Sequence, residues 1–205
     1  MYPSDSPGKM ADNPKPVVQD SMDSSEKEST DLLMQAKQTG SVFQSIVKLK
    51  TAADMARQAY DNEAAVKYYK QSLELACQHP GTIDAQTEYD LLSGRAACLE
   101  LLGLYREQQL DLDVMRRLAK EIEDVPRQIQ VVTSQVILDN SLGIYVEAQQ
   151  AAESALELAR QVGNRALEAD CLTSLGVTFN SLSDYAHTLA CHEEALRIRR
   201  ELGDT

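Results

Sequence analysis

From Ser41 onward, apolar residues recur at intervals of three and four positions, with polar residues between them. The last part of the chain holds two consecutive runs with this spacing: Leu172, Leu175, Phe179 and Leu182, and then Tyr185, Leu189 and Leu196. Such intervals place the apolar side chains on one face of an α-helix. We therefore predict eight amphipathic helices, over residues 41–59, 62–78, 83–102, 105–121, 126–142, 145–162, 165–182 and 185–202.

The residues between the predicted helices are typical of helix ends. The candidate N-caps, whose side chains accept a hydrogen bond from the first turn, are Asp61, Asp124, Asn164 and Asp184. The candidate glycines for left-handed backbone after a helix are Gly103, Gly143, Gly163 and Gly203. Connections this short make neighbouring helices antiparallel, so the pattern predicts helical hairpins.

A turn signature recurs three times at intervals of forty residues. Its copies are Leu102-Gly103 with Tyr105, Leu142-Gly143 with Tyr145, and Leu182-Ser183 with Tyr185. An earlier segment, EAAVKYYKQSLELA at 63–76, matches the second half of the repeated unit. One hairpin cannot bury its apolar face alone, whereas stacked hairpins can. The repeat therefore predicts an all-α fold, a right-handed α-solenoid of four antiparallel hairpins over residues 41–205.

Residues 171–204 carry the positions of a known repeat. They are Leu175-Gly176 in the first helix, Phe179 one turn later, Asp184-Tyr185 at the turn, and Ala195-Leu196 in the second helix. This pattern resembles a tetratricopeptide repeat, and the resemblance extends over about residues 45–204. The chain departs from the pattern where small residues are expected, at Gln108, Met115 and Thr188, and where Leu-Gly is expected, at Arg95-Ala96 and Gln135-Val136.

The forty-residue period is similar to the repeats of spindle-orientation adaptors, kinesin light chains and bacterial signalling proteins. This resemblance implies a protein–protein interaction scaffold that binds a partner peptide or helix in a concave groove. Residues 52–76 also look like the start of the repeat regions that follow an ATPase or cyclase module in large bacterial regulators. The alternative hypothesis is therefore a sensory or scaffold fragment of a larger signalling regulator, associated with an ATPase, cyclase or kinase. No GxxxxGK phosphate-binding loop accompanies it, since Gly8-Lys9 stands alone.

The first helix of every hairpin is expected to line the concave face of such an array. By register, the predicted groove residues are Lys50, Asp54, Arg57, Asp90, Ser93, Glu100, Gln130, Thr133, Asn140, Asp170, Thr173, Val177 and Asn180. Asn140 and Asn180 lie forty residues apart, and an Asn side chain both donates to and accepts from a peptide backbone. These two residues are therefore our candidates for holding an extended peptide.

Charge narrows the class of partner. The chain carries 20 Lys and Arg residues against 32 Asp and Glu residues, a net charge of −12. This balance argues against nucleic acid and anionic membranes, which attract basic surfaces. Within the groove, Asp90, Glu100 and Asp170 favour a neutral to basic peptide. The family resemblance would also allow a clamp of Lys and Arg side chains that holds a carboxylate. This clamp is disfavoured because Asp54 stands between its candidate cations, Lys50 and Arg57.

One group of residues in the sequence suggests catalytic chemistry. His187 and Cys191 lie four apart on one helix, and Cys171 belongs to the facing helix, so a metal- or thiol-dependent helical enzyme is a third hypothesis. No fourth ligand has an obvious place, and no strained elbow, oxyanion loop or orienting residue accompanies the thiols. We therefore predict no enzyme activity, no cofactor and no metal.

The two ends of the chain differ from the repeats. Residues 1–40 are predicted to be a disordered tail, broken by Pro3, Pro7, Pro14 and Pro16, in which 31–40 is compatible with a short helix. The last hairpin ends at Gly203-Asp204 without a polar capping helix, so we expect an array that continues or self-associates there.

The four cysteines lack CxxC spacing, and no run of 18 apolar residues occurs. Both features favour a cytoplasmic protein with reduced thiols.

Overall fold

The computed structural model describes residues 42–203, which form eight α-helices and no strand. The helices are α2 (Val42–Gln58), α3 (Asn62–Gln78), α4 (Ala85–Leu101), α5 (Tyr105–Glu121), α6 (Val125–Leu142), α7 (Tyr145–Gln161), α8 (Arg165–Ser181) and α9 (Tyr185–Glu201). Every end lies within two residues of its predicted position, so the predicted helices are confirmed. The predicted tail over 1–40 lies outside the described residues.

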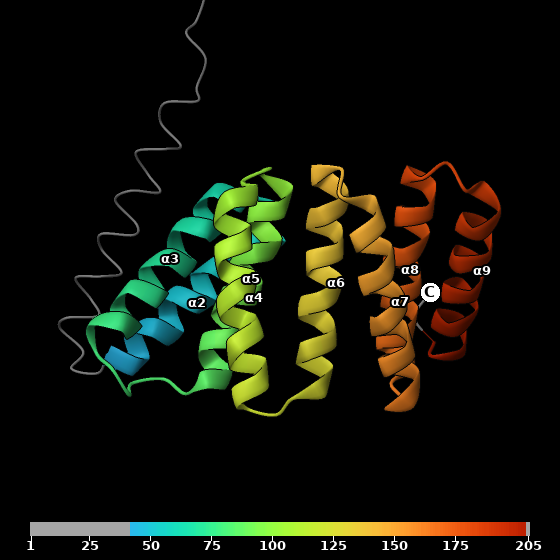
Figure 1. The fold of residues 1–205 in the computed structure, drawn as a ribbon. Helices are drawn as coiled ribbons and strands as arrows, with labels where there is room; N and C mark the ends of the chain where they lie inside the picture. The colour runs from blue at the N-terminus through green and yellow to red at the C-terminus, as the bar shows by residue number, and fades with distance from the viewer. Residues whose placement is uncertain (1–41, 204–205) are drawn as a thin grey trace, which may run out of the picture.

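The helical hairpins stand side by side in chain order and form a helical solenoid, from α2 and α3 at one end to α8 and α9 at the other (Figure 1). The predicted N-caps are confirmed: each side chain accepts a hydrogen bond from a backbone N–H three residues on, and Asp84 does the same for α4. The turn between α8 and α9 needs no glycine, because Ser183 adopts the left-handed conformation there with φ of 62°.

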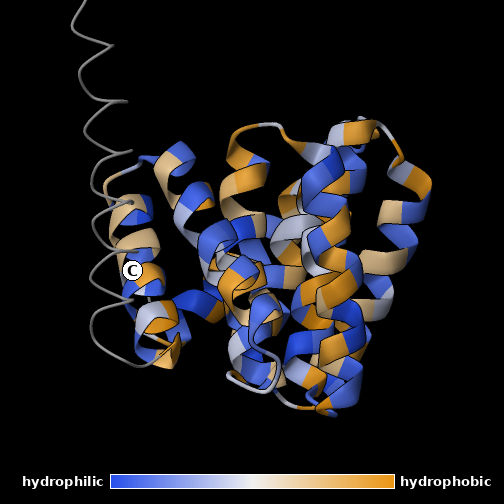
Figure 2. Ribbon diagram, turned by 90° about the vertical axis from the view of Figure 1, so that its left-hand side faces the viewer, coloured by the Kyte–Doolittle hydropathy of each residue, from blue (hydrophilic) through white to orange (hydrophobic). Residues whose placement is uncertain are grey.

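Hydrophobic and hydrophilic residues interleave along each helix (Figure 2), and the apolar faces meet in three successive clusters. Each cluster reaches into the next hairpin. Leu91 and Cys98 of α4 pack in the first cluster, with α2 and α3. Val131 and Leu138 of α6 pack in the second, with α4 and α5. Every hairpin therefore depends on a neighbour to bury its apolar face, as expected for stacked repeats.

Two glycines allow close contact between helices. A Cβ atom on Gly94 of α4 would lie 2.4 Å from the ring of Tyr69 on α3, and one on Gly176 of α8 would lie 2.9 Å from the ring of His192 on α9. Neither distance is tolerable for real Cβ contacts, so both positions require glycine for this packing. Gly176 belongs to the Leu-Gly pair from which the repeat was recognised.

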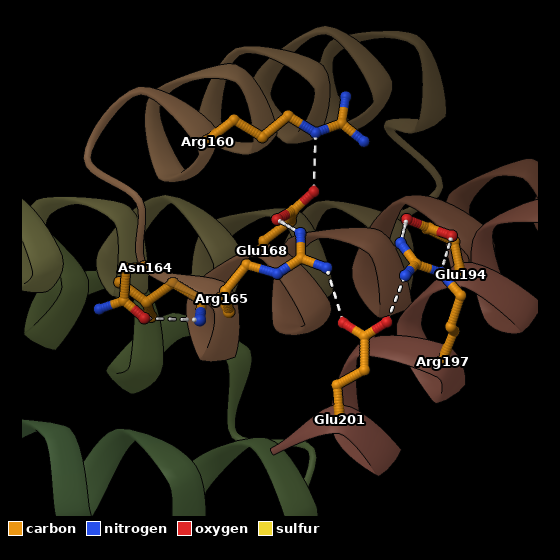
Figure 3. Close-up of polar contacts among 8 residues, drawn as sticks. Arg160, Asn164, Arg165, Glu168, Glu194, Arg197 and Glu201 are labelled. Atoms are coloured by element: carbon orange, nitrogen blue, oxygen red, sulfur yellow. Dashed lines mark hydrogen bonds and ion pairs between the residues drawn. The ribbon is translucent and has the colours of Figure 1, made fainter.

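A chain of ion pairs joins the last three helices (Figure 3). The buried carboxylate of Glu168 on α8 accepts from Arg160 of α7 at 2.9 Å and from Arg165 of its own helix. Arg165 also contacts Glu201 of α9 at 3.3 Å, and Glu201 pairs in turn with Arg197. Because Glu168 is out of solvent, its two arginines compensate a charge that would otherwise be costly to bury.

None of the described helices has a segment that is both long enough and apolar enough to cross a membrane.

Candidate functional site

Two adjoining cavities lie along the first helices of the hairpins. The first, of about 490 Å³, is bordered by α2, α4 and α6, and the second, of about 370 Å³, by α4, α6 and α8. Both are lined by Tyr89, Ser93 and Gln130, so they lie next to each other on the same face. We refer to the two cavities together as the groove.

Nine of the thirteen predicted groove residues line these cavities. The first cavity holds Lys50, Asp54, Arg57, Asp90, Ser93 and Gln130, and the second adds Thr133, Asp170 and Thr173. The other four lie elsewhere on the first helices. Glu100 is half-buried near the end of α4, where burial raises the pKa of its carboxyl, and Val177 and Asn180 are exposed on α8.

Asn140 and Asn180, which the sequence treats as a matched pair, occupy different environments. The Asn140 amide nitrogen donates to the hydroxyl of Thr178 on α8 at 2.9 Å, and the Asn140 Oδ1 is buried without a hydrogen-bond partner among residues 42–203. Asn180 is exposed. The forty-residue equivalence therefore does not extend to the contacts of these two side chains, because α8 is followed by no further first helix in the described chain.

The wall of the first cavity on α2 is a three-residue cluster. Lys50 Nζ lies 2.8 Å from Asp54 Oδ2, and the Tyr69 hydroxyl donates to Asp54 Oδ1. Burial acts to raise the pKa of Asp54, but the hydrogen bonds from Lys50 and Tyr69 outweigh it and leave this pKa below its ordinary value. Burial, together with the hydrogen bond to Asp54, raises the pKa of Tyr69. Asp54 is thus a paired carboxylate, whereas Arg57 beside it has no ion pair among the described residues.

The opposite wall is organised by Arg127 at the start of α6. Its guanidinium contacts Asp90 of α4 at 2.9 Å and Asp124, the N-cap of α6, at 2.6 Å. The same guanidinium lies 5.1 Å from the centre of the Tyr89 ring, whose hydroxyl donates to the Arg127 carbonyl. Burial raises the pKa of Tyr89 to about 12. Arg127 therefore joins α4 to α6 at the first cavity and pairs with both Asp90 and Asp124.

The second cavity is less charged. Its one ion pair joins Arg199 of α9 to Asp170 of α8 at 3.1 Å. Hydroxyl groups of α6 and α8, such as that of Ser134, alternate there with the apolar side chains of Met115, Ile137 and Leu167. The groove thus changes along its length from a charged surface to a surface of hydroxyl and hydrocarbon groups.

Comparison with known proteins agrees with this architecture. The tetratricopeptide repeat family matches residues 169–202. The match covers one repeat unit, α8 and α9, and the remaining helices repeat the same hairpin arrangement. No curated protein matches the sequence.

Two solved structures share the fold. The crystal structure of a Rap protein complexed with Competence and Sporulation Factor superposes with a TM-score of 0.67 at 17% identity, over 75% of this chain and 42% of the Rap protein. BtubC (BKLC) from P. vanneervenii superposes with a TM-score of 0.62 at 16% identity, over 78% of this chain and 65% of BtubC. The chain therefore spans less than two thirds of either protein, and identities this low establish the fold alone.

Sequence reasoning missed groove residues that are not on first helices. Tyr69 of α3 and Arg199 of α9 reach the cavities from second helices, and Met115 of α5 does so in the second cavity. A register argument that assigns the concave face to first helices cannot find them. Arg127 was detectable in principle, because it is a cation in the first turn after the N-cap Asp124, where a carboxylate is within reach.

The residues that suggested metal or thiol chemistry are not assembled into a site. The His187 ring stacks on Phe179 and its Nδ1 lies 2.7 Å from Asp184, while Cys171 and Cys191 are buried. Burial raises the pKa of both thiols, which disfavours the reactive thiolate. Among residues 42–203, no group of three His, Cys, Asp or Glu residues is placed to hold a metal ion.

Proposed function

We propose that this tetratricopeptide array is a protein-interaction scaffold that binds a partner peptide or helix in the groove. The observation that carries the proposal is that two adjoining cavities share Tyr89, Ser93 and Gln130 and together border α2, α4, α6 and α8. Cavities arranged in this way offer contacts along several turns of a bound segment. Repeat arrays use such extended surfaces for binding.

The groove offers hydrogen bonds that its own helices do not use. Ser93, Gln130 and Ser134 make no hydrogen bond through their side chains within residues 42–203, and all three face a cavity. A peptide backbone alternates donors and acceptors, and hydroxyl and amide groups serve as both. Tyr89 and Ile137 supply apolar contact area between these polar groups. This composition suits an extended segment with mixed polar and apolar side chains.

We further propose a neutral to basic partner. Within the groove Asp54, Asp90 and Asp170 are each paired with a cation of this chain, so local charge is nearly balanced and a neutral segment meets no strong penalty. At longer range the net charge of −12 attracts basic segments and repels acidic ones. Arg57 has no ion pair among the described residues, so a basic partner segment could still place one carboxylate beside it.

A second candidate function is the sensing of a ligand as part of a larger regulator. It is motivated by the Rap protein structure, which is described as a complex with Competence and Sporulation Factor and of which this array spans 42%.

All four cysteines are free, which is consistent with a reducing compartment, and we place the protein in the cytoplasm.

Selection from a displayed library of random peptides on the purified chain tests groove binding. Enriched peptides are then titrated by fluorescence anisotropy against two matched variants, Gln130→Arg in the groove and Gln150→Arg on α7, both exposed in the free chain. We expect Gln130→Arg to weaken binding at least about tenfold, which corresponds to about 1.4 kcal/mol, and Gln150→Arg to leave it unchanged. Equal affinities for both variants, or no enriched peptide, would refute the groove assignment.

A further inference from the structure

The outer face of α9 is apolar and uncovered. Tyr185, Leu189 and Leu196 lie along one side of this helix, with 68%, 60% and 48% of their surfaces exposed. Forty residues earlier on α7, Tyr145 is half-buried, and Leu156 is only 7% exposed because it packs in an apolar cluster with residues of α8. The face of α9 that a following helix would cover therefore has the chemistry of an interface.

The first helix of the array has the opposite character on the corresponding outer face. Later first helices place two buried residues seven apart against the preceding hairpin: Leu91 and Cys98, Val131 and Leu138, and Cys171 and Thr178, all 0–1% exposed. In α2 these two positions are Lys48, which is exposed, and Met55. Burying the Lys48 ammonium against leucines would leave an uncompensated charge. Stacking of α2 from one copy on α9 of another, which would build open filaments, is therefore disfavoured.

The outer face of α9 is complementary to itself. Tyr185 lies four residues before Leu189, and Arg200 lies four residues after Leu196, so the spacing of these four positions is the same when the helix is reversed. An antiparallel second copy therefore sets Leu189 against Leu196 twice. It also sets each Arg200 beside Tyr185 of the other copy, where a guanidinium can stack on a phenol ring.

The charges around the face are compatible with this pairing. Arg200 has no ion pair within residues 42–203 and is free to stack, whereas its neighbour Arg197 is held by Glu194 and Glu201 (Figure 3). Near the centre of the antiparallel pair, Glu193 of one copy faces His192 of the other. A two-fold pairing thus leaves no cation buried without a partner, in contrast to the arrangement with Lys48.

We propose that the outer face of α9 is a homodimer interface, in which α9 pairs antiparallel with α9 of a second copy about a two-fold axis. One helix pair buries less than the standard interface of about 800 Å² per partner, so the dimer forms in the micromolar rather than the nanomolar range. The groove remains open in the dimer, because its walls are formed mainly by α2, α4, α6 and α8. This inference therefore does not depend on the proposed function.

Sedimentation equilibrium from low to high micromolar concentration tests the dimer. We expect the full chain to dimerise and the double variant Leu189→Asp/Leu196→Asp to stay monomeric, with unchanged helicity and melting temperature because both side chains are exposed. The matched control is Leu110→Asp, an exposed leucine on α5 (62%), which should dimerise like the parent. A parent chain that is monomeric throughout, or a double variant that still dimerises, overturns the proposal.

Disulfide trapping tests the antiparallel geometry. In a Cys77→Ser background, which removes the exposed thiol, a mixture of Leu189→Cys and Leu196→Cys chains should cross-link on mild oxidation. Leu189→Cys alone should not, because the two copies of that position lie far apart in an antiparallel pair. Cross-linking of Leu189→Cys alone at least as efficient as that of the mixture would overturn the antiparallel pairing, and so would the absence of any cross-linked product from the mixture.

Discussion

The junctions α5–α6 and α7–α8 occupy equivalent places in successive repeats, yet different chemistry holds them. At α7–α8, Leu156 and Leu175 lie 7% and 5% exposed in a common apolar cluster. Forty residues earlier, the same two positions are Arg116 and Gln135, whose side chains are joined by a hydrogen bond of 2.9 Å. The two junctions have the same helix arrangement, although apolar side chains in one correspond to polar side chains in the other.

The polar junction extends beyond that one pair. Gln135 and Gln109 exchange hydrogen bonds of 2.9 and 3.1 Å, and Arg116 also contacts Asp113 at 2.8 Å. These groups are partly exposed, so each bond contributes on the order of 1 kcal/mol or less. Full burial of a leucine contributes roughly 1.5–3 kcal/mol. The comparison teaches that repeat geometry needs only part of the apolar face, here Leu112, Val131 and Leu138, and that α5–α6 is the weaker junction.

The largest expected effect separates the two junctions directly. Leu156→Ala leaves a cavity between α7 and α8 and should lower the free energy of unfolding by about 3 kcal/mol. Arg116→Ala, at the same register in α5, should lower it by less than about 1 kcal/mol, because it removes partly exposed polar contacts. Urea unfolding followed by circular dichroism measures both. Equal losses would show that the two junctions are energetically equivalent.

A second prediction concerns the buried ion pair that joins α4 to α5. Asp111 is almost wholly buried and is held by Arg95, whose Nε donates to Asp111 Oδ2 at 2.8 Å. Arg95→Met would leave this carboxylate uncompensated and should cost about 2–3 kcal/mol at about pH 7.

The pH dependence of that variant follows from the pKa of Asp111. Burial raises this pKa, and Arg95 opposes the rise. The folded chain therefore holds the proton more tightly than the unfolded chain, and stability falls as pH rises from the ordinary value of about 3.9 through the raised one. Without Arg95 the pKa rises further, so the deficit of Arg95→Met should shrink as the pH approaches about 4. A deficit independent of pH would mean that lost packing, rather than the charge, causes it.

A smaller effect, of opposite sign, is expected at Gln108. This side chain is fully buried in α5, and neither amide atom has a hydrogen-bond partner among the described residues. Replacing it with a residue of similar shape, Gln108→Met, should therefore stabilise the chain by about 1 kcal/mol. Gln109→Met, next in the chain, removes a paired amide and should give no gain. Thermal melting of the two variants decides the matter, and a lower melting temperature for Gln108→Met would contradict the prediction.

The smallest effect sharpens the comparison by converting one junction into the other. Arg116→Leu combined with Gln135→Leu gives α5–α6 the residues that α7–α8 has, and should raise the free energy of unfolding by about 0.5–1 kcal/mol. The gain is smaller than the loss in Leu156→Ala because existing hydrogen bonds are removed in exchange. Hydrogen exchange of the α5 and α6 amides should slow in the same variant. Faster exchange would indicate that the leucines do not pack.

Helices and their ends could be predicted because the signals are local. Apolar spacing, N-cap side chains and turn glycines act within one or two turns, and Asp61 and Gly143 serve as predicted. The forty-residue period then predicted that the hairpins stack, because each repeat buries its apolar face in the same way. Contacts between side chains on different repeats were not readable in this way.

The groove shows most clearly which contacts cannot be predicted from the sequence. The contact of Asn140 with Thr178 joins residues 38 positions apart, and nothing in the sequence distinguishes Asn140 from Asn180. Tyr69 enters the groove from a second helix because Gly94 opposite has no side chain, which is a property of two helices together. The departures at Gln108 and Arg95 were visible, but only the packing shows that Gln108 is buried without a hydrogen-bond partner and that Arg95 pairs with the buried Asp111.

The missing methyl group at Gly94 gives this array a simple route to divergence. The Tyr69 ring occupies the space that a Cβ would fill, and from there its hydroxyl donates to Asp54 in the wall of the first cavity. In a descendant with alanine at this position, the ring is displaced, Asp54 loses a donor, and that end of the groove changes shape and charge together. One codon change at Gly94, which lines the first cavity, would thus alter the groove through the displaced Tyr69 ring rather than through the methyl group that it adds.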